Sequence, residues 1–181
     1  RQVEEGQKLC SQLGLRNVEL RAENFMDFTA DDAPFDYILC HGVYSWVPPT
    51  VQSRILEIVQ NHLSTHGIGY ISYNTYPGFY RRQPIMEMMR QHVAGSGAVD
   101  PVAKVREARA LLQFLLKGQS EPEGTTARLL RDEAQLIERL PDSYVFHEHF
   151  EEHNRPCYFR EFMERATEHQ LQYVGEAAAR G

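Results

Sequence analysis

Two short runs of strand-forming residues flank a helical segment, and this alternation limits the possible fold more than any other feature of the sequence. The first run is FDYILC (35–40) and the second is IGYISYN (68–74). Between them, apolar residues share one face of a helix, at Val51, Ile55, Ile58, Val59 and Leu63. Two strands joined through a helix pair in parallel, with a right-handed crossover. The pattern therefore predicts a β-α-β unit of an open parallel sheet.

The residues before this unit extend the same alternation. A helical pattern over residues 3–13 ends at Gly14, and NVELR (17–21) alternates apolar with polar residues, as a strand does. We expect 17–21 to be a third strand of the sheet. Residues 1–78 then correspond to a doubly wound parallel α/β sheet.

Three local features refine this prediction. The unbroken apolar run in 36–40 is typical of a strand that is buried on both faces of a parallel sheet. Thr50 is expected to cap the helix that follows, and His66-Gly67 to end it.

The character of the sequence changes after Phe79. Residues 84–94 are rich in Ile, Met and Val, Asp100-Pro101 opens a helix that Gly118 ends, and a further helical pattern stops at Pro141. We therefore divide the chain into a partial α/β core (1–80), an all-helical insertion (81–143) and a segment (144–181) that returns to the sheet. In this last segment the pattern predicts a helix over 159–169 and a strand over 171–177.

Charge and cysteine content exclude several classes of protein. The 181 residues carry a formal net charge of −6, and the longest basic cluster is Arg81-Arg82, so we expect no nucleic-acid partner. No run reaches the roughly 18 apolar residues that a membrane-spanning helix needs. Cys10, Cys40 and Cys157 are far apart and form no CxxC pair. This usage is typical of the reducing cytosol, and we expect a cytoplasmic protein.

Open parallel sheets bind ligands outside the carboxyl ends of their strands, and polar and aromatic residues follow all three predicted strands. The first is followed by Ala22, Glu23, Asn24 and Phe25, the second by His41, Gly42, Tyr44 and Trp46, and the third by Asn74, Thr75, Tyr76 and Gly78. We expect these strand ends to meet at one crevice. Structural roles stay open for single residues: Tyr44 and Trp46 can pack against the next helix, Glu23 can be a solvated loop charge, and Gly42 can serve only the turn.

Other chemistries find little support. HEHFEEHN (147–154) holds three histidines and three glutamates, but its spacing is neither HExxH nor a cysteine-bearing zinc pattern, so we predict no metal site. The sequence also lacks a GxSxG nucleophile elbow and a GxxxxGK[ST] phosphate loop.

The quoted stretches resemble a known family. FDYILCHGVYSWVPP (35–49), a helix, Gly67 and YISYNTYPGF (70–79) resemble the second half of class I S-adenosylmethionine-dependent methyltransferases. HEHFEEHNRPCYFREFMERATEHQLQYVGEA (147–177) resembles the methyltransferase regulatory domain that accompanies this core in some bacterial proteins, among them protein-lysine methyltransferases. SYNTYPGF and NRPCYF are the most specific parts. The resemblance implies the C-terminal half of a doubly wound, Rossmann-like methyltransferase sheet, strands three to five, with an all-helical insertion.

The resemblance also assigns site residues. Those placed at S-adenosylmethionine are Glu23 and Asn24 near the adenine, Phe25 through its backbone N–H, and His41 and Gly42 beside the sulfonium. Those placed around the methyl acceptor, as catalytic residues, are Tyr44, Trp46, Asn74 and Tyr76.

The chain departs from the family in one respect. The glycine-rich loop after the family's first strand, and the acidic residue after its second, are absent. We therefore expect an internal fragment of a longer enzyme, inactive by itself.

The expected function is methyl transfer to a nucleophilic nitrogen or oxygen, on a protein lysine or a small molecule. Two alternatives stay open: a non-catalytic partner-binding module, and a nicotinamide-dependent Rossmann oxidoreductase. Calorimetry with S-adenosylmethionine separates the first alternative from the enzyme. Homo-oligomerisation is also left open.

Overall fold

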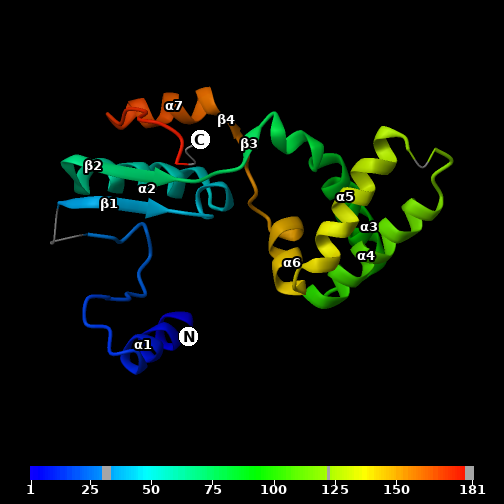
Figure 1. Cartoon of the computed structure of the whole chain (residues 1–181), viewed down its shortest axis with the longest axis horizontal. Helices are drawn as coiled ribbons and strands as arrows, with labels where there is room; N and C mark the ends of the chain where they lie inside the picture. The colour runs from blue at the N-terminus through cyan, green and yellow to red at the C-terminus, as the bar shows by residue number, and fades with distance from the viewer. Residues whose placement is uncertain (30–33, 122, 178–181) are drawn as a thin grey trace.

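The computed structural model describes residues 1–29, 34–121 and 123–177, and it divides into an α/β part and a bundle of helices (Figure 1). The elements in chain order are α1 (Gln2–Gln12), β1 (Phe35–Cys40), η1 (Tyr44–Trp46), α2 (Pro49–His62), β2 (Leu63–Ile71), β3 (Thr75–Tyr76), η2 (Gly78–Arg81), α3 (Gln83–Ser96), α4 (Pro101–Lys117), α5 (Thr125–Arg139), α6 (Asp142–Phe150), β4 (Cys157–Tyr158) and α7 (Phe159–Glu168).

The predicted β-α-β unit is confirmed. β1 and β2 pair in parallel through the crossover helix α2, with Tyr37 opposite Ile68 and Cys40 opposite Ile71. The register shifts between Phe35 and Tyr37, so the regular ladder of β2 begins only at Ile68. The fold is therefore mixed α/β with parallel strand pairs.

Among the described residues, other elements cover only one face of this sheet. Cys40, Ile55 and Leu56 form a buried cluster with Tyr44, and Ile71, Phe162 of α7 and Leu171 pack against it. Both α2 and α7 thus lie on the same side of the sheet. On the other side Tyr37 and Leu39 are 70% and 73% exposed. The prediction that β1 is buried on both faces is wrong for the described residues, because no element of them covers that side.

Two predicted strands do not form. Residues 17–21 run as irregular chain after α1, and residues 171–177 do the same after α7. A strand needs a hydrogen-bonding neighbour, and in doubly wound sheets the third strand lies beside the second rather than the fourth. The described residues offer 17–21 no such neighbour. At 171–177 the chain instead turns at Gln170, whose φ is 57°, and Leu171 donates to the carbonyl of Ala166.

The ends of α2 also differ from the prediction. Pro48 is the N-cap residue and Pro49 occupies the first turn, so Thr50 lies inside the helix. Proline suits this place because the first helical N–H groups have no partner within the helix. α2 ends at His62 and continues directly into β2, not at His66-Gly67 as expected.

The helices predicted after Phe79 form a bundle with its own core. Met89, Val105, Leu112, Leu130 and Ile137 are all buried there at 2% exposure or less. The Asp100 carboxylate caps α4 by accepting a hydrogen bond from Ala103 N at 2.9 Å, as predicted. α6 was not predicted. It adds Val145 to the same core, so the bundle of the described residues continues to Phe150.

A buried charged cluster joins three elements of this bundle. Arg82, just before α3, binds both carboxylate oxygens of Glu133 on α5 at 2.8 and 3.0 Å, and Glu148 on α6 at 2.7 Å. His149 Nε2 lies 2.6 Å from Glu133 Oε1, and its Nδ1 lies 2.9 Å from the carbonyl of Val145. Both ring nitrogens of the buried His149 therefore have a hydrogen-bonding partner.

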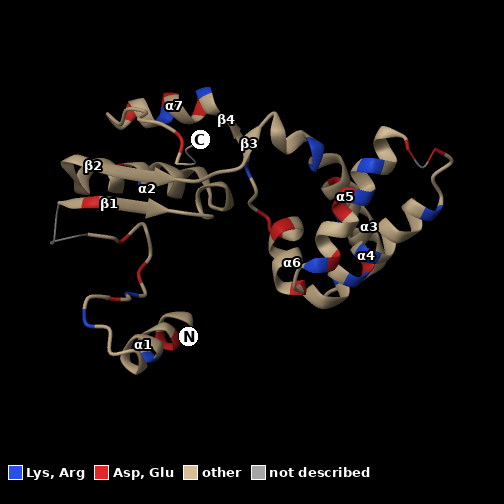
Figure 2. Cartoon of the chain, viewed as in Figure 1, with Lys and Arg blue, Asp and Glu red and all other residues tan. Residues whose placement is uncertain are grey.

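Figure 2 shows acidic and basic residues interspersed along α3 to α7. None of the helices formed by the described residues is long and apolar enough to cross a membrane. All three cysteines are free thiols, and Cys40 and Cys157 are buried.

Candidate functional site

The two stretches that the sequence marks as most specific, SYNTYPGF (72–79) and NRPCYF (154–159), lie side by side at the carboxyl end of β2. β3 pairs in parallel with β4, with Thr75 opposite Cys157. The Cys157 N–H donates to the carbonyl of Asn74 at 3.1 Å, and Asn74 Nδ2 donates to Asn154 Oδ1, also at 3.1 Å. This junction is where the chain leaves the α/β part for the helical bundle and returns from it (Figure 1).

The turn after β1 is tied to the same junction. Ser45, which is 1% exposed, accepts a hydrogen bond from Asn74 N through its hydroxyl, and its carbonyl accepts one from Arg155 N, both at 2.8 Å. Gly42 has a φ of 68° and donates its N–H to Ser72 Oγ at 2.8 Å. Three segments far apart in sequence are therefore held together by hydrogen bonds to the backbone. We call residues 42–46, 72–77 and 154–158 together the rim.

Tyr44 and Trp46 contribute to the rim in different ways. Tyr44 is 1% exposed, and its ring packs edge-on against Phe162 at 5.4 Å and Tyr73 at 6.1 Å. Burial raises the pKa of Tyr44, and the nearby guanidinium of Arg165 opposes that rise. Trp46 is half-buried and its ring lies 4.4 Å from that of His147 on α6. The first residue is thus part of a core, whereas the second contacts the helical bundle.

Tyr76 belongs to an aromatic cluster at the edge of the rim. Its ring stacks on Tyr80 at 4.4 Å and lies 5.4 Å from Tyr158, and the hydroxyls of Tyr80 and Tyr158 are 3.0 Å apart. Tyr80 and Tyr158 are 49% and 42% exposed. Burial, followed by the neighbouring Tyr80, raises the pKa of Tyr76. A partially exposed group of electron-rich rings is suited to contact with a cationic side chain.

The residues predicted to bind the cofactor do not all reach the rim. His41 is exposed at the end of β1, where its ring stacks on Tyr70 with 5.8 Å between centroids. Glu23, Asn24 and Phe25 lie on the irregular chain before β1. Arg54 of α2 holds that chain by donating to the carbonyl of Phe25 at 3.2 Å.

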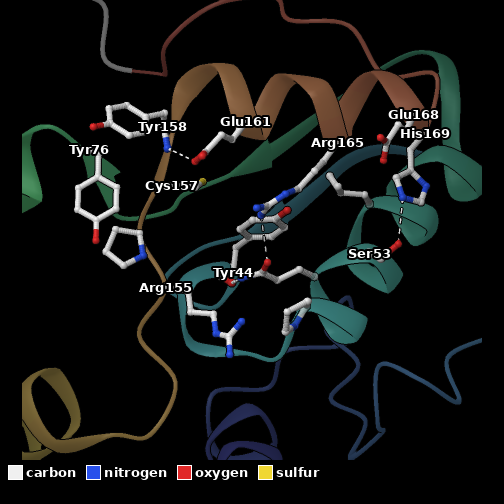
Figure 3. Close-up of a pocket in the computed structure, with 14 residues that line it drawn as sticks. Tyr44, Ser53, Tyr76, Arg155, Cys157, Tyr158, Glu161, Arg165, Glu168 and His169 are labelled. Carbon is white, nitrogen blue, oxygen red and sulfur yellow. Dashed lines mark hydrogen bonds between the residues drawn. The ribbon is translucent and has the colours of Figure 1, made fainter.

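The described residues enclose a cleft of about 590 Å³ between α2, α7 and the rim (Figure 3). It is lined by Tyr44, Pro49, Gln52, Ser53, Leu56, Tyr76, Arg155, Pro156, Cys157, Tyr158, Glu161, Arg165, Glu168 and His169. Of the residues predicted from the sequence it contains Tyr44 and Tyr76, but none of those assigned to the cofactor. Asn74 and Trp46 belong to the rim and do not line the cleft. Among the described residues, the three predicted strand ends therefore do not share this cleft.

The sequence reasoning assigned no role to Arg155, Cys157, Tyr158 or Arg165. Arg155, Cys157 and Tyr158 belong to the NRPCYF stretch, which the sequence marked as specific without indicating where it lies in the fold, whereas Arg165 lies outside that stretch. Burial raises the pKa of the Cys157 thiol.

The histidines of 147–154 have separate surroundings. His147 contacts Trp46, His149 is buried against Glu133, and His153 is half-buried. Within the described parts of the chain, no group of three or more His, Cys, Asp or Glu side chains lies close enough to hold a metal ion.

The carboxyl end of β1 has space for a ligand. A Cβ added at Gly42 would meet no atom within 4 Å, and both His41 and Gly42 are exposed. This space is open to a ligand, and the placement of His41 and Gly42 beside the sulfonium stays a prediction of the resemblance.

Comparison with known proteins defines the class to which this arrangement is related. Residues 141–180 match a family model described as "Predicted methyltransferase regulatory domain". This match covers α6, β4 and α7 and includes the third segment of the rim, residues 154–158.

Solved structures make the relation more specific. The chain is similar to PKMT2 from Rickettsia typhi in complex with AdoHcy, with 41% identity and a TM-score of 0.83 over 97% of this chain and 33% of that one. A second structure of PKMT2 from Rickettsia typhi matches with 38% identity, a TM-score of 0.79, and coverage of 98% and 35%. These matches confirm the resemblance to methyltransferases carrying a regulatory domain.

Two curated relatives agree with these structures. Uncharacterized proteins RP789 and RP028 of Rickettsia prowazekii (strain Madrid E) are 38% and 40% identical over 97% and 91% of this chain. The chain spans 31% of the first and 65% of the second, so it corresponds to part of the length of both.

Proposed function

We propose that this chain is part of an S-adenosylmethionine-dependent methyltransferase whose acceptor is a protein lysine. The main support is its 41% identity and TM-score of 0.83 to PKMT2, a structure that holds AdoHcy, the demethylated form of the methyl donor. The chain covers 33% of PKMT2, so activity, cofactor and acceptor are proposed for the whole protein. In this proposal β1 and β2 are neighbouring strands of a larger doubly wound sheet, and the helices of 81–143 are an insertion beside it.

The cofactor is proposed to lie at the carboxyl end of β1, where His41 and Gly42 are exposed beside open space. S-adenosylmethionine, when bound, supplies an activated methyl group on a sulfonium. The contribution of this chain is to position that end of the ligand, since the Gly42 turn is held by the Ser72 hydroxyl at 2.8 Å. The assignment of Glu23, Asn24 and Phe25 to the adenine rests on the resemblance.

The acceptor is proposed to approach over the rim, where Tyr76, Tyr80 and Tyr158 form the partially exposed aromatic cluster and Trp46 and Asn74 lie nearby. Aromatic faces attract an ammonium group, and removal from water lowers the pKa of a lysine. The ammonium must first release a proton to solvent. The nitrogen lone pair then forms the N–C bond while the S–C bond breaks. Tyr44, the buried residue of the rim, anchors it to the core.

The test is methyl transfer by the full-length protein. It is incubated with isotopically labelled S-adenosylmethionine and a bacterial protein extract, and labelled residues are identified by mass spectrometry. Asn74→Ala removes the hydrogen bond to Asn154, and misplacement of the rim by about 1 Å can lower the rate by about 100-fold. Tyr144→Ala, on the exposed part of α6, is the matched control and should leave the rate unchanged.

Two outcomes would count against the proposal. Absence of calorimetric heat with S-adenosylmethionine would favour the partner-binding alternative. An unchanged rate of methyl transfer in Asn74→Ala would show that the rim has no role in the reaction.

A further inference from the structure

The cleft between α2 and α7 contains charged groups whose roles methyl transfer does not explain. α2 contributes Gln52, Ser53 and Leu56, and α7 contributes Glu161, Arg165 and Glu168 from one helical face (Figure 3). Parallel helices on one face of a sheet normally close against each other through apolar side chains. Here polar side chains bridge them: Arg165 donates to Gln52 Oε1 at 3.2 Å, and Ser53 Oγ lies 3.2 Å from His169 Nε2.

Neither of the two guanidinium groups in this cleft forms an ion pair with a carboxylate of the residues that the structure describes. Arg165 bonds to the neutral Gln52, and the side chain of Arg155 forms no hydrogen bond or ion pair with any part of the chain that the structure describes. Other arginines differ, since Arg82 and Arg109 both pair with carboxylates at 2.8 Å or less. An unpaired guanidinium facing a cleft has its donors free for an incoming anion.

A buried hydroxyl in the same cleft also lacks a partner. Tyr44 is 1% exposed, yet its Oη has no hydrogen-bond partner among the residues described. The guanidinium of Arg165 lies close to this hydroxyl and opposes the rise in the pKa of Tyr44. A tyrosine hydroxyl can accept from a guanidinium and donate its own hydrogen at the same time, and a buried donor without an acceptor is costly. One oxygen atom of a ligand can accept hydrogen bonds from both at once.

The two acidic residues of the cleft, Glu161 and Glu168, lie on either side of Arg165 along α7. Glu161 accepts a hydrogen bond from the backbone N–H of Tyr158 at 2.8 Å, at the start of α7. Glu168 lies two turns further along the helix, next to His169, so Arg165 sits between the two carboxylates (Figure 3). Arg165 and the Tyr44 hydroxyl therefore lie together between the two carboxylates, and the Arg155 guanidinium lies apart from them in the same cleft (Figure 3).

We infer that this cleft binds a small anionic molecule whose carboxylate or phosphate oxygens accept hydrogen bonds from Tyr44, Arg155 and Arg165. Its volume of about 590 Å³ lies within the range of small-molecule sites, roughly 300–1,000 Å³. None of the residues assigned to the methyl donor lines it, so this ligand is a separate one. Because Arg155 also belongs to the rim, the bound anion holds the segment 154–158 against α2.

The test is isothermal titration calorimetry of the full-length protein with inorganic phosphate and, separately, with succinate, against potassium chloride at equal ionic strength. We expect saturable binding of one probe or both, weakened by about tenfold or more in Arg155→Gln and in Arg165→Gln. Arg155 is exposed, so its substitution tests binding without disturbing a core. Tyr44→Phe keeps the ring and removes the hydroxyl, and should also weaken binding.

Arg160→Gln is the matched control, since Arg160 lies on the same helix but is 87% exposed and pairs with Glu164 at 3.4 Å. Binding to this variant should equal that of the unaltered protein. Binding of phosphate alone identifies a phosphorylated ligand, and binding of succinate alone a carboxylate. Absence of saturable binding of either probe, or an equal loss in Arg160→Gln, would overturn the inference.

Discussion

The buried charged cluster of the helical bundle yields a quantitative prediction for Glu133→Gln. Burial by itself raises the pKa of Glu133, but hydrogen bonds from His149 and Arg82 outweigh it and lower the pKa from 4.5 to about 2. A difference of about 2.5 pKa units corresponds to about 3 kcal/mol of folding free energy. Removal of one partner from a buried pair costs a similar amount, about 3–5 kcal/mol. We therefore expect Glu133→Gln to lower the free energy of unfolding by about 3 kcal/mol at neutral pH.

The lowered pKa of Glu133 also determines how the free energy of unfolding depends on pH. Because the folded carboxyl has the lower pKa, the unfolded chain binds more protons in acid, and acid favours unfolding. The contribution of Glu133 is complete above the unfolded pKa near 4.5, falls to about half by pH 3, and is lost as the pH passes below about 2. The difference in stability between the unaltered protein and Glu133→Gln should shrink over this range.

Urea unfolding of the full-length protein, followed by circular dichroism between pH 7 and pH 3, measures this difference. Asp132→Asn is the control, since Asp132 is the neighbouring residue on α5 and pairs with Arg81 at 3.3 Å while 64% exposed. Exposed ion pairs contribute about 0–1 kcal/mol. Equal losses in the two variants, or a loss in Glu133→Gln that does not decrease in acid, would refute the reasoning.

Two further predictions concern the cores. Leu112→Ala, at a fully buried position of α4, should lower the free energy of unfolding by about 2–5 kcal/mol. Phe114 is 73% exposed on the same helix, so Phe114→Ala should change the free energy of unfolding by about 0.5 kcal/mol or less. Urea titration measures both values. Burial raises the pKa of the Cys40 and Cys157 thiols, so these thiols should react with iodoacetamide at pH 8 more slowly than Cys10. Mass spectrometry of the labelled peptides measures the three rates, and equal rates in the folded protein would contradict this prediction.

The helices were the part of the fold that could be predicted best. Asp100 followed by proline marks the start of α4, and the apolar positions of α4 and α5 recur with helical spacing. Such signals act within about one or two turns, so they survive in the folded chain. The two absent strands show the limit of this reasoning. An alternating pattern at 17–21 indicates which side chains a strand would bury, but a strand forms only where a neighbouring strand pairs with its backbone hydrogen-bonding groups.

The candidate site was predicted in part. The expectation that residues after β1 and β2 lie near each other is confirmed by the hydrogen bond from Asn74 N to Ser45 Oγ. The roles of Glu23, His41 and the other assigned residues stay predictions. Arg155 and Arg165 could not be singled out, because an arginine in a polar stretch is far more often a solvated surface charge.

The sequence by itself determined most of the local elements: the helices other than α6, the parallel β-α-β unit, and the two stretches with unusual composition at 72–79 and 154–159. Periodicity, proline and glycine carry that information within a few residues of chain. The tertiary structure alone decided that these two stretches, about 80 positions apart, pair as β3 and β4. It also decided that Tyr44, Arg155 and Arg165 line the same cleft. Such contacts depend on how whole helices and strands pack, and the spacing of residues in the sequence does not indicate which hydrogen-bond donors will line one cleft.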